Sequence, residues 1–210
     1  WLKSSKSIAR DVQKGGIRMS EEIFGAVQKL PVNGTKKQVV LQCAPLLTGI
    51  KLSNLLNVRS DQKEEVLRIF EGSPVCCRVL YEFQGRLSIL LYRPGMLAAY
   101  LEREDVKKLM TSFGYENPDL EETLNRIADA YQEHMNGKRG FPHEIGLVLG
   151  YPPVDVEGFI EKEGRDFLYS GYWKVYGQAE RARNIFHAYD EARIELLKHY
   201  LKTGEIKIEE

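Results

Sequence analysis

Hydrophobic residues recur every three or four positions over most of the chain, which is the spacing of a helix with one buried face. The clearest example lies between residues 178 and 202, and Gly204 follows it. Its apolar stripe consists of Ala182, Ile185, Phe186, Tyr189, Ala192, Leu196, Leu197, Tyr200 and Leu201. The pattern predicts a long C-terminal helix that ends at the glycine.

Shorter helices are predicted from similar stripes and from capping residues. Asp119 and Glu122 form a capping-box pattern ahead of one of them, and Pro45 suits the first turn of another that carries Leu46, Leu47, Ile50, Leu55 and Leu56. The predicted helices cover residues 20–30, 35–43, 45–56, 60–71, 94–101, 105–113 and the stretch after Asp119.

Strict alternation of apolar and polar residues marks the strands. Residues 75–83 and 86–92 alternate on either side of Gln84-Gly85, which predicts a hairpin with a tight turn. A third strand is predicted over Tyr172–Tyr176. We therefore expect an α+β fold, mostly helical, with a small antiparallel sheet and helices on one face. We expect a basic, helical extension over 1–34, a single domain over 35–204 and a tail over 205–210.

Charge and composition exclude several classes of function. The 210 residues carry 30 basic and 30 acidic side chains, whereas a general nucleic-acid binder usually has a basic excess. The local excess in residues 1–18 is typical of a solvated leader or an amphipathic helix. No apolar run is long enough to span a bilayer, and no secretory signal is recognisable, although a chain that opens on Trp1 suggests a processed form. Three cysteines do not predict a disulfide framework, so we expect a cytoplasmic protein.

Glycines, prolines and aromatic residues are concentrated in residues 141–177. Two short helices, predicted over 142–150 and 153–164, are joined so tightly that they imitate a helix-turn-helix. The second helix carries Asp155, Glu157, Glu161 and Glu163 against a lone Lys162, so it would meet DNA phosphates with negative charge. This favours a structural helical corner over a DNA-binding unit.

His143 and Glu144 lie in the first turn of the first of these helices. They do not form a zinc-protease motif, because position 147 is Leu. A carboxylate at Glu144 complements the helix dipole. His143, with Lys138 and Arg139 upstream, could cradle a phosphate or carboxylate, or it could be a partly buried histidine beside a solvated loop.

Other candidates are a cysteine, several cations and an aromatic strand. Cys43, predicted just before a helix start, could be a nucleophile or soft ligand, or a buried structural cysteine. Cys76 and Cys77 would point to opposite faces of a strand, which disfavours joint metal binding. Tyr172 and Trp173 could stack on a planar ligand with Lys174 neutralising its charge, or they could be core and edge residues.

Four phrases of the sequence, in this order along the chain, resemble the domain-of-unknown-function family 3793, which comprises uncharacterised proteins of Clostridia and related anaerobes. They are Cys43–Lys51, Tyr92-Arg93-Pro94, the run from Phe141 to Pro152, and Gly171–Tyr176. The resemblance covers residues 39–200. It implies a cytoplasmic protein of an anaerobe with a redox- or iron-related role, and it brings no established activity.

We combine these candidates into one expected site that binds a small anionic or planar ligand or cofactor. In an enzyme, Cys43 would be the nucleophile or metal ligand and His143 the acid, base or ligand. The expected ligand-binding residues are Lys51, Arg93, Glu144, Tyr172, Trp173 and Lys174. The alternatives are a non-catalytic protein-interaction module and, less favoured, a helix-turn-helix DNA binder. The identity of any metal or cofactor stays open.

Overall fold

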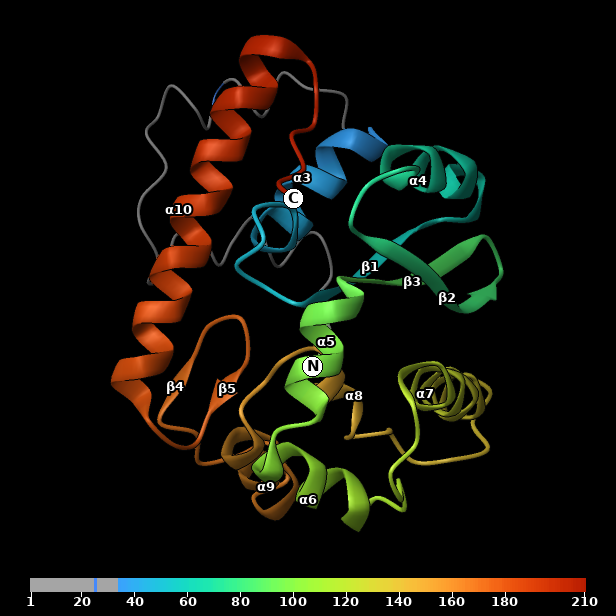
Figure 1. Ribbon diagram of the computed structural model, residues 1–210, viewed down its shortest axis with the longest axis vertical. Helices are drawn as coiled ribbons and strands as arrows, with labels where there is room; N and C mark the ends of the chain where they lie inside the picture. The colour runs from blue at the N-terminus through green and yellow to red at the C-terminus, as the bar shows by residue number, and fades with distance from the viewer. Residues whose placement is uncertain (1–24, 26–33) are drawn as a thin grey trace.

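The computed structural model describes Gly25 and residues 34–210 (Figure 1). Apart from Gly25, the predicted helix over 20–30 and the basic stretch 1–18 lie outside the described residues. The elements are α3 (Thr35–Leu47), β1 (Ser53–Arg59), the 3₁₀ turn η1 (Ser60–Gln62), α4 (Lys63–Phe70), β2 (Cys76–Phe83), β3 (Arg86–Tyr92), α5 (Pro94–Leu101), α6 (Glu104–Ser112), α7 (Leu120–Met135), α8 (Ile145–Val148), α9 (Pro153–Glu161), β4 (Tyr169–Ser170), β5 (Lys174–Val175) and α10 (Ala179–Thr203). The expected α+β class, mostly helical with little sheet, is confirmed.

The main sheet is antiparallel, with the strand order β1-β3-β2. The predicted hairpin is β2–β3, and both residues of its turn, Gln84 and Gly85, have the positive φ that a tight hairpin turn requires. The ladder between β2 and β3 is interrupted by a bulge between Val79 and Tyr81. Strand β3 lies in the centre of the sheet and is buried over all its residues except Arg86.

Side chains of β3 alternate between two hydrophobic cores, one on each face of the sheet. Leu87, Ile89 and Leu91 belong to the core built with α3 and α4, whereas Leu90 and Tyr92 belong to the core built with α5, α6, α7, α8 and α9. Helix α10 joins the two cores, because Phe186 in its first half lies in the second core and Leu197 in its second half lies in the first. The expectation of helices on one face is therefore wrong: both faces are covered (Figure 1).

The predicted helix over 45–56 is also wrong. Helix α3 passes through Pro45 to Leu47, and Gly49 then adopts a positive φ that helical residues cannot have. The leucines assigned to that helix belong in part to β1, in which Leu56 and Val58, two residues apart, face the same core. Cys43 therefore lies in the body of α3 and not ahead of a helix start.

The predicted strand over 172–176 is confirmed in part, as β5 (Lys174–Val175), and it belongs to a separate small hairpin. Tyr169 and Ser170 in β4 pair with Val175 and Lys174 in β5, and neither strand joins the main sheet. The third strand of the main sheet is β1. The hairpin instead lies against α9 and the start of α10 (Figure 1).

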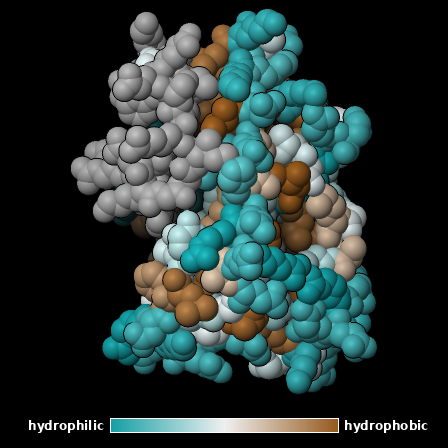
Figure 2. Space-filling view, turned by 90° about the vertical axis from the view of Figure 1, so that its left-hand side faces the viewer, coloured by the Kyte–Doolittle hydropathy of each residue, from teal (hydrophilic) through white to brown (hydrophobic). Residues whose placement is uncertain are grey.

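The C-terminal segment 205–210 is attached to the domain. Ile206 and Ile208 pack against the core of α3 and α4, and the Glu209 N–H donates to the Leu47 carbonyl at 2.9 Å. The side of the molecule that carries α10 is largely hydrophilic, with separate apolar patches (Figure 2). No helix in the described part of the chain has both the length and the apolar character needed to cross a membrane.

Candidate functional site

Cys43 and Lys51 flank one side chain, Asn54, which β1 places between them. The Asn54 Nδ2 donates to Cys43 Sγ at 3.4 Å, and Lys51 Nζ donates to Asn54 Oδ1 at 3.1 Å. Burial raises the pKa of the Cys43 thiol to about 12 and lowers the pKa of Lys51 to about 8. The structure thus brings these two predicted residues together through an asparagine that the sequence analysis did not single out.

Trp173 is linked to this cluster through Tyr151. The Lys51 Nζ lies 5.9 Å from the centre of the Tyr151 ring, which stacks on the Trp173 ring at 5.2 Å. Phe186 packs against the same indole at 4.5 Å in an edge-to-face arrangement. The Trp173 Nε1 donates to the buried Asp155 carboxylate at 2.7 Å. Its ring and its N–H group are therefore engaged within the protein.

Tyr172 is also engaged. Its hydroxyl donates to Asp190 Oδ1 at 2.8 Å and accepts from Arg193, and Asp190 and Arg193 form an ion pair at 3.2 Å. Its ring packs edge-on against Tyr189, 5.0 Å between centres. Burial raises the pKa of Tyr172. These contacts fasten the β4–β5 hairpin to α10.

His143 and Lys174 lie at a different place, where both approach Phe159. The His143 ring is 5.7 Å from the Phe159 ring, and Lys174 Nζ is 5.6 Å from it and 5.0 Å from the Phe167 ring. Lys174 donates to the Gly164 carbonyl at 2.5 Å. Burial lowers the pKa of His143, whose Nδ1 is buried without a hydrogen-bond partner among the described residues.

Arg93 and Glu144 each have a partner within the protein. The Arg93 guanidinium donates to the carbonyls of Leu46 at 3.0 Å, Leu47 at 3.3 Å and Glu209 at 2.6 Å, so it caps α3 and holds the C-terminal segment. Glu144 is buried, and Arg139 Nη2 lies 3.2 Å from its Oε1. The pairing neutralises one of the two cations expected to cradle an anion beside His143.

The printed contacts divide the eight predicted residues into three groups. Cys43, Lys51 and Trp173 form one connected line, His143 and Lys174 meet at Phe159, and Arg93, Glu144 and Tyr172 serve local structure. Of the eight, Trp173 borders a groove of ligand size between α5, α6, α9 and the start of α10.

This groove has a volume of about 500 Å³, within the range of small-molecule sites. Helices α6 and α9 lie beside each other at the end of the molecule where α10 begins (Figure 1). The lining residues are Tyr100, Arg103, Asp105, Lys108, Leu109, Ser112, Gly150, Pro152, Pro153, Val154, Glu157, Trp173, Gln178, Arg181, Ile185 and Tyr189.

Three cations border the groove. Arg103 is paired with Asp105 at 2.6 Å, whereas Lys108 and Arg181 make no ion pair within the described residues. Arg181 Nη1 donates to Gln178 Oε1, at 3.3 Å. Tyr100 and Tyr189 supply aromatic walls, and the Tyr100 hydroxyl donates to the Tyr151 carbonyl at 2.7 Å. The groove therefore combines aromatic surface with cations available to an anion.

Most groove residues were missed at the sequence level. Lys108 and Arg181 lie on separate helices that meet only after folding, and each by itself has the pattern of a solvated helix position. No local pattern in the sequence distinguishes them, because no aromatic residue lies one, three or four positions from either cation.

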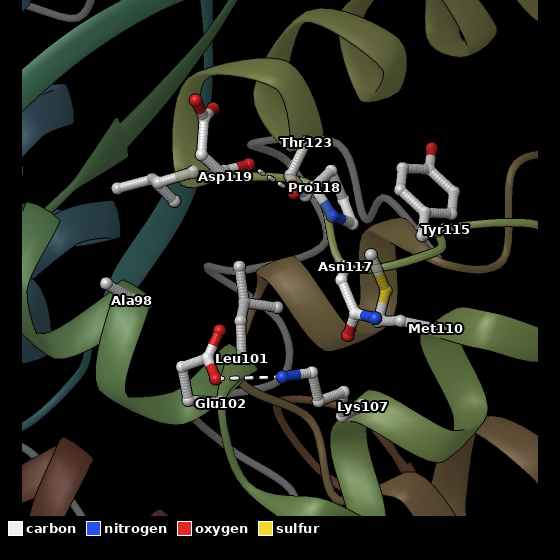
Figure 3. A pocket seen from close by; sticks show the side chains of 11 residues that line it. Ala98, Leu101, Glu102, Lys107, Met110, Tyr115, Asn117, Pro118, Asp119 and Thr123 are labelled. Carbon is white, nitrogen blue, oxygen red and sulfur yellow. Dashed lines mark hydrogen bonds and ion pairs between the residues drawn. The ribbon is translucent and has the colours of Figure 1, made fainter.

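A second cavity, of about 80 Å³, lies between α5, α6 and the start of α7 (Figure 3). An ion pair between Glu102 and Lys107, at 3.0 Å, lies at its edge, with Leu101, Met110 and Tyr115 also around it. Its volume is enough for only a few water molecules. Among the described residues, no group of three or more His, Cys, Asp or Glu side chains is placed to hold a metal ion.

Comparison with known proteins shows that most of the chain matches one family. The family model described as protein of unknown function, DUF3793, matches residues 39–208. The chain belongs to this family. The match includes most of α3, the sheet, the groove, α10 and most of the C-terminal segment. No curated protein and no solved structure matches the chain.

Proposed function

We propose that this DUF3793 protein binds a small organic anion with a planar, apolar part in the groove between α5, α6, α9 and α10. The observation that carries the proposal is a ligand-sized cavity with aromatic walls and two cations, Lys108 and Arg181, that have no carboxylate partner among the described residues. An anion between them would replace the missing ion pairs. We further expect the protein to act in the cytoplasm in a redox- or iron-related role.

The proposed ligand belongs to the class expected from the sequence, but its site is the groove and not the expected site with Cys43 and His143. Trp173 would contact the ligand with the part of its ring that borders the groove, because Tyr151 and Phe186 pack against the rest. Cys43 and His143 are not among the groove residues, so ligand binding here does not depend on them.

Flavin mononucleotide and riboflavin form a matched pair of probes, because they share a planar ring system and only the first carries a phosphate. Trp173 is the sole tryptophan once Trp1 is replaced by Phe, so its emission reports occupancy of the groove. We expect flavin mononucleotide to bind at least about tenfold more tightly than riboflavin, a difference of roughly 1.4 kcal/mol.

The double variant Lys108→Gln/Arg181→Gln should remove most of this preference. Lys198→Gln, on the same helix as Arg181 but away from the groove, should leave it unchanged. Equal affinities for the two probes, or a preference that survives the double variant, would contradict the proposal.

A second candidate function, a non-catalytic protein-interaction module, is favoured by exposed apolar side chains near the groove. Val154 and Ile160 on α9 and Phe167 and Leu168 after it are all exposed, Leu168 by 61%. The double variant Phe167→Ser/Leu168→Ser separates the candidates. It should abolish association with a co-purifying protein if that role holds, and leave flavin mononucleotide binding intact.

A further inference from the structure

Lys51 is a buried cation with few partners. Only 7% of its surface is exposed, and its one hydrogen bond within the described residues is to Asn54 Oδ1. Arg93, the other buried cation of the described residues, is better satisfied, because its guanidinium donates to three carbonyls. No carboxylate pairs with Lys51 in the described part of the chain.

The neighbouring thiol does not act as a counter-ion. Cys43 is fully buried, and burial raises its pKa to about 12, so the sulfur is neutral at pH 7. The same burial lowers the pKa of Lys51 to about 8, which leaves a substantial fraction of its side chain as free amine near neutral pH. A desolvated lysine beside an apolar ring is the usual setting of a nucleophilic amine.

A lysine at this position is costly for packing alone. Burying an ammonium without an ion pair destabilises the folded state, whereas a methionine of similar length would not. The geometry points to a use for the amine itself. We propose that Lys51 is the nucleophile of a second site, separate from the groove, that forms an imine with a small aldehyde. This inference stands independently of the proposed ligand groove.

The chemical step needs no oxidant or reductant. The free amine of Lys51 adds to the carbonyl carbon of the aldehyde to give a carbinolamine. Loss of water then breaks the bond from carbon to oxygen and completes the C=N bond, and the two protons of the amine leave with the oxygen. The Tyr151 ring, 5.9 Å from Nζ, would stabilise the protonated imine.

The surroundings favour an aldehyde over an acyl donor. Acyl transfer requires donors aimed at a developing oxyanion. The Asn54 amide, which is the group beside the amine, already donates to Cys43 Sγ and to the Leu55 carbonyl at 3.3 Å. Both of its hydrogens are used, whereas imine formation passes through a neutral carbinolamine that does not need them.

The test is competitive labelling of the intact protein with propanal and cyanoborohydride at pH 7, followed by peptide mass spectrometry. Reduction fixes each imine as a propylated lysine. The internal reference is Lys198, whose side chain is 57% exposed. The fraction of free amine differs by more than a hundredfold between pKa values of 8 and 10.5, so even with restricted access Lys51 should be labelled at least about tenfold faster.

The labelling rate of Lys51 should rise with pH and reach half its maximum near pH 8. In concentrated urea, Lys51 should no longer be labelled faster than Lys198. Labelling of Lys51 at or below the rate of Lys198 in the folded protein would overturn the inference. So would an advantage that persists in urea, because it would then arise from local sequence and not from the folded site.

Discussion

The buried polar residues of this protein differ in how completely their partners satisfy them. Asp155 is 1% exposed and accepts three hydrogen bonds: from Trp173 Nε1, from the Tyr176 N–H at 2.7 Å and from the Gly177 N–H at 3.0 Å. Lys51, in contrast, has one hydrogen bond and no carboxylate partner in the described part of the chain. The hydrogen bonds of Asp155 stabilise the fold. The burial of Lys51 destabilises it, which indicates that the amine has a chemical role.

Asp155→Ala should destabilise the protein by about 3 kcal/mol, because it leaves the buried Trp173 Nε1–H and two part-buried backbone N–H groups without their acceptor. The measurement is the free energy of unfolding in urea. Glu157→Ala, two residues along the same helix at an exposed position, should change it by less than about 0.5 kcal/mol. Similar losses in the two variants would show that the Asp155 network contributes little.

Lys51→Met should raise the free energy of unfolding at pH 7. It should also remove the part of the pH dependence of stability that arises from Lys51. The folded-state pKa of Lys51 is about 8, below its ordinary value of 10.5. Between these values the unfolded state binds more protons, so the stability of the wild type rises with pH.

The advantage of Lys51→Met over the wild type should therefore shrink between pH 7 and pH 10, by up to roughly 3 kcal/mol. The urea midpoints of both proteins across this range provide the measurement. Burial also raises the pKa of the Cys43 and Cys77 thiols, but these residues are present in both proteins and largely cancel in the difference. Parallel pH profiles would exclude a low pKa at Lys51.

At the scale of elements, the sequence predicted those whose signals are local. The capping residue Asp119 accepts from the Glu122 N–H at 2.7 Å, and the Gln84-Gly85 turn joins the expected hairpin. The wrong predictions concern segments whose secondary structure depends on tertiary contacts. The leucines after Gly49 fit a helix by spacing, but they form β1 because β3 offers a partner along its whole length. The strand predicted at 172–176 spans Lys174–Val175 alone, because the Tyr176 and Gly177 N–H groups donate to Asp155 and not to a neighbouring strand.

Contact between α9 and the β4–β5 hairpin depends on Gly158. A Cβ there would lie 2.5 Å from Tyr176 Cβ, close to the backbone, where the side chain cannot swing away. Gly158→Ala should lower the free energy of unfolding by about 2 kcal/mol through overpacking.

The matched control is Gly95→Ala in α5, whose added Cβ meets no atom of the described residues within 4 Å and which should be neutral or slightly stabilising. Thermal unfolding of both variants, followed by circular dichroism, gives the comparison. Equal melting temperatures for the two would mean that α9 and the hairpin are not tightly packed.

At the scale of the whole molecule, the main sheet separates two cores, and the groove opens at one end of the core that contains Trp173. The sequence indicated a dense segment at 141–177, and that segment does supply part of the groove, including Pro152, Val154 and Trp173. It could not indicate the opposite wall, because Lys108 and Arg181 are brought there by α6 and α10. The expectation of one site joining Cys43, His143 and Trp173 lacked this three-dimensional information.

A crystal structure of the protein soaked with flavin mononucleotide tests the central claim most directly. The account predicts density for the ring system in the groove against Tyr100 and Trp173, with the phosphate within hydrogen-bond distance of Lys108 or Arg181. Density for the flavin at another place, with the groove filled only by solvent, would contradict it.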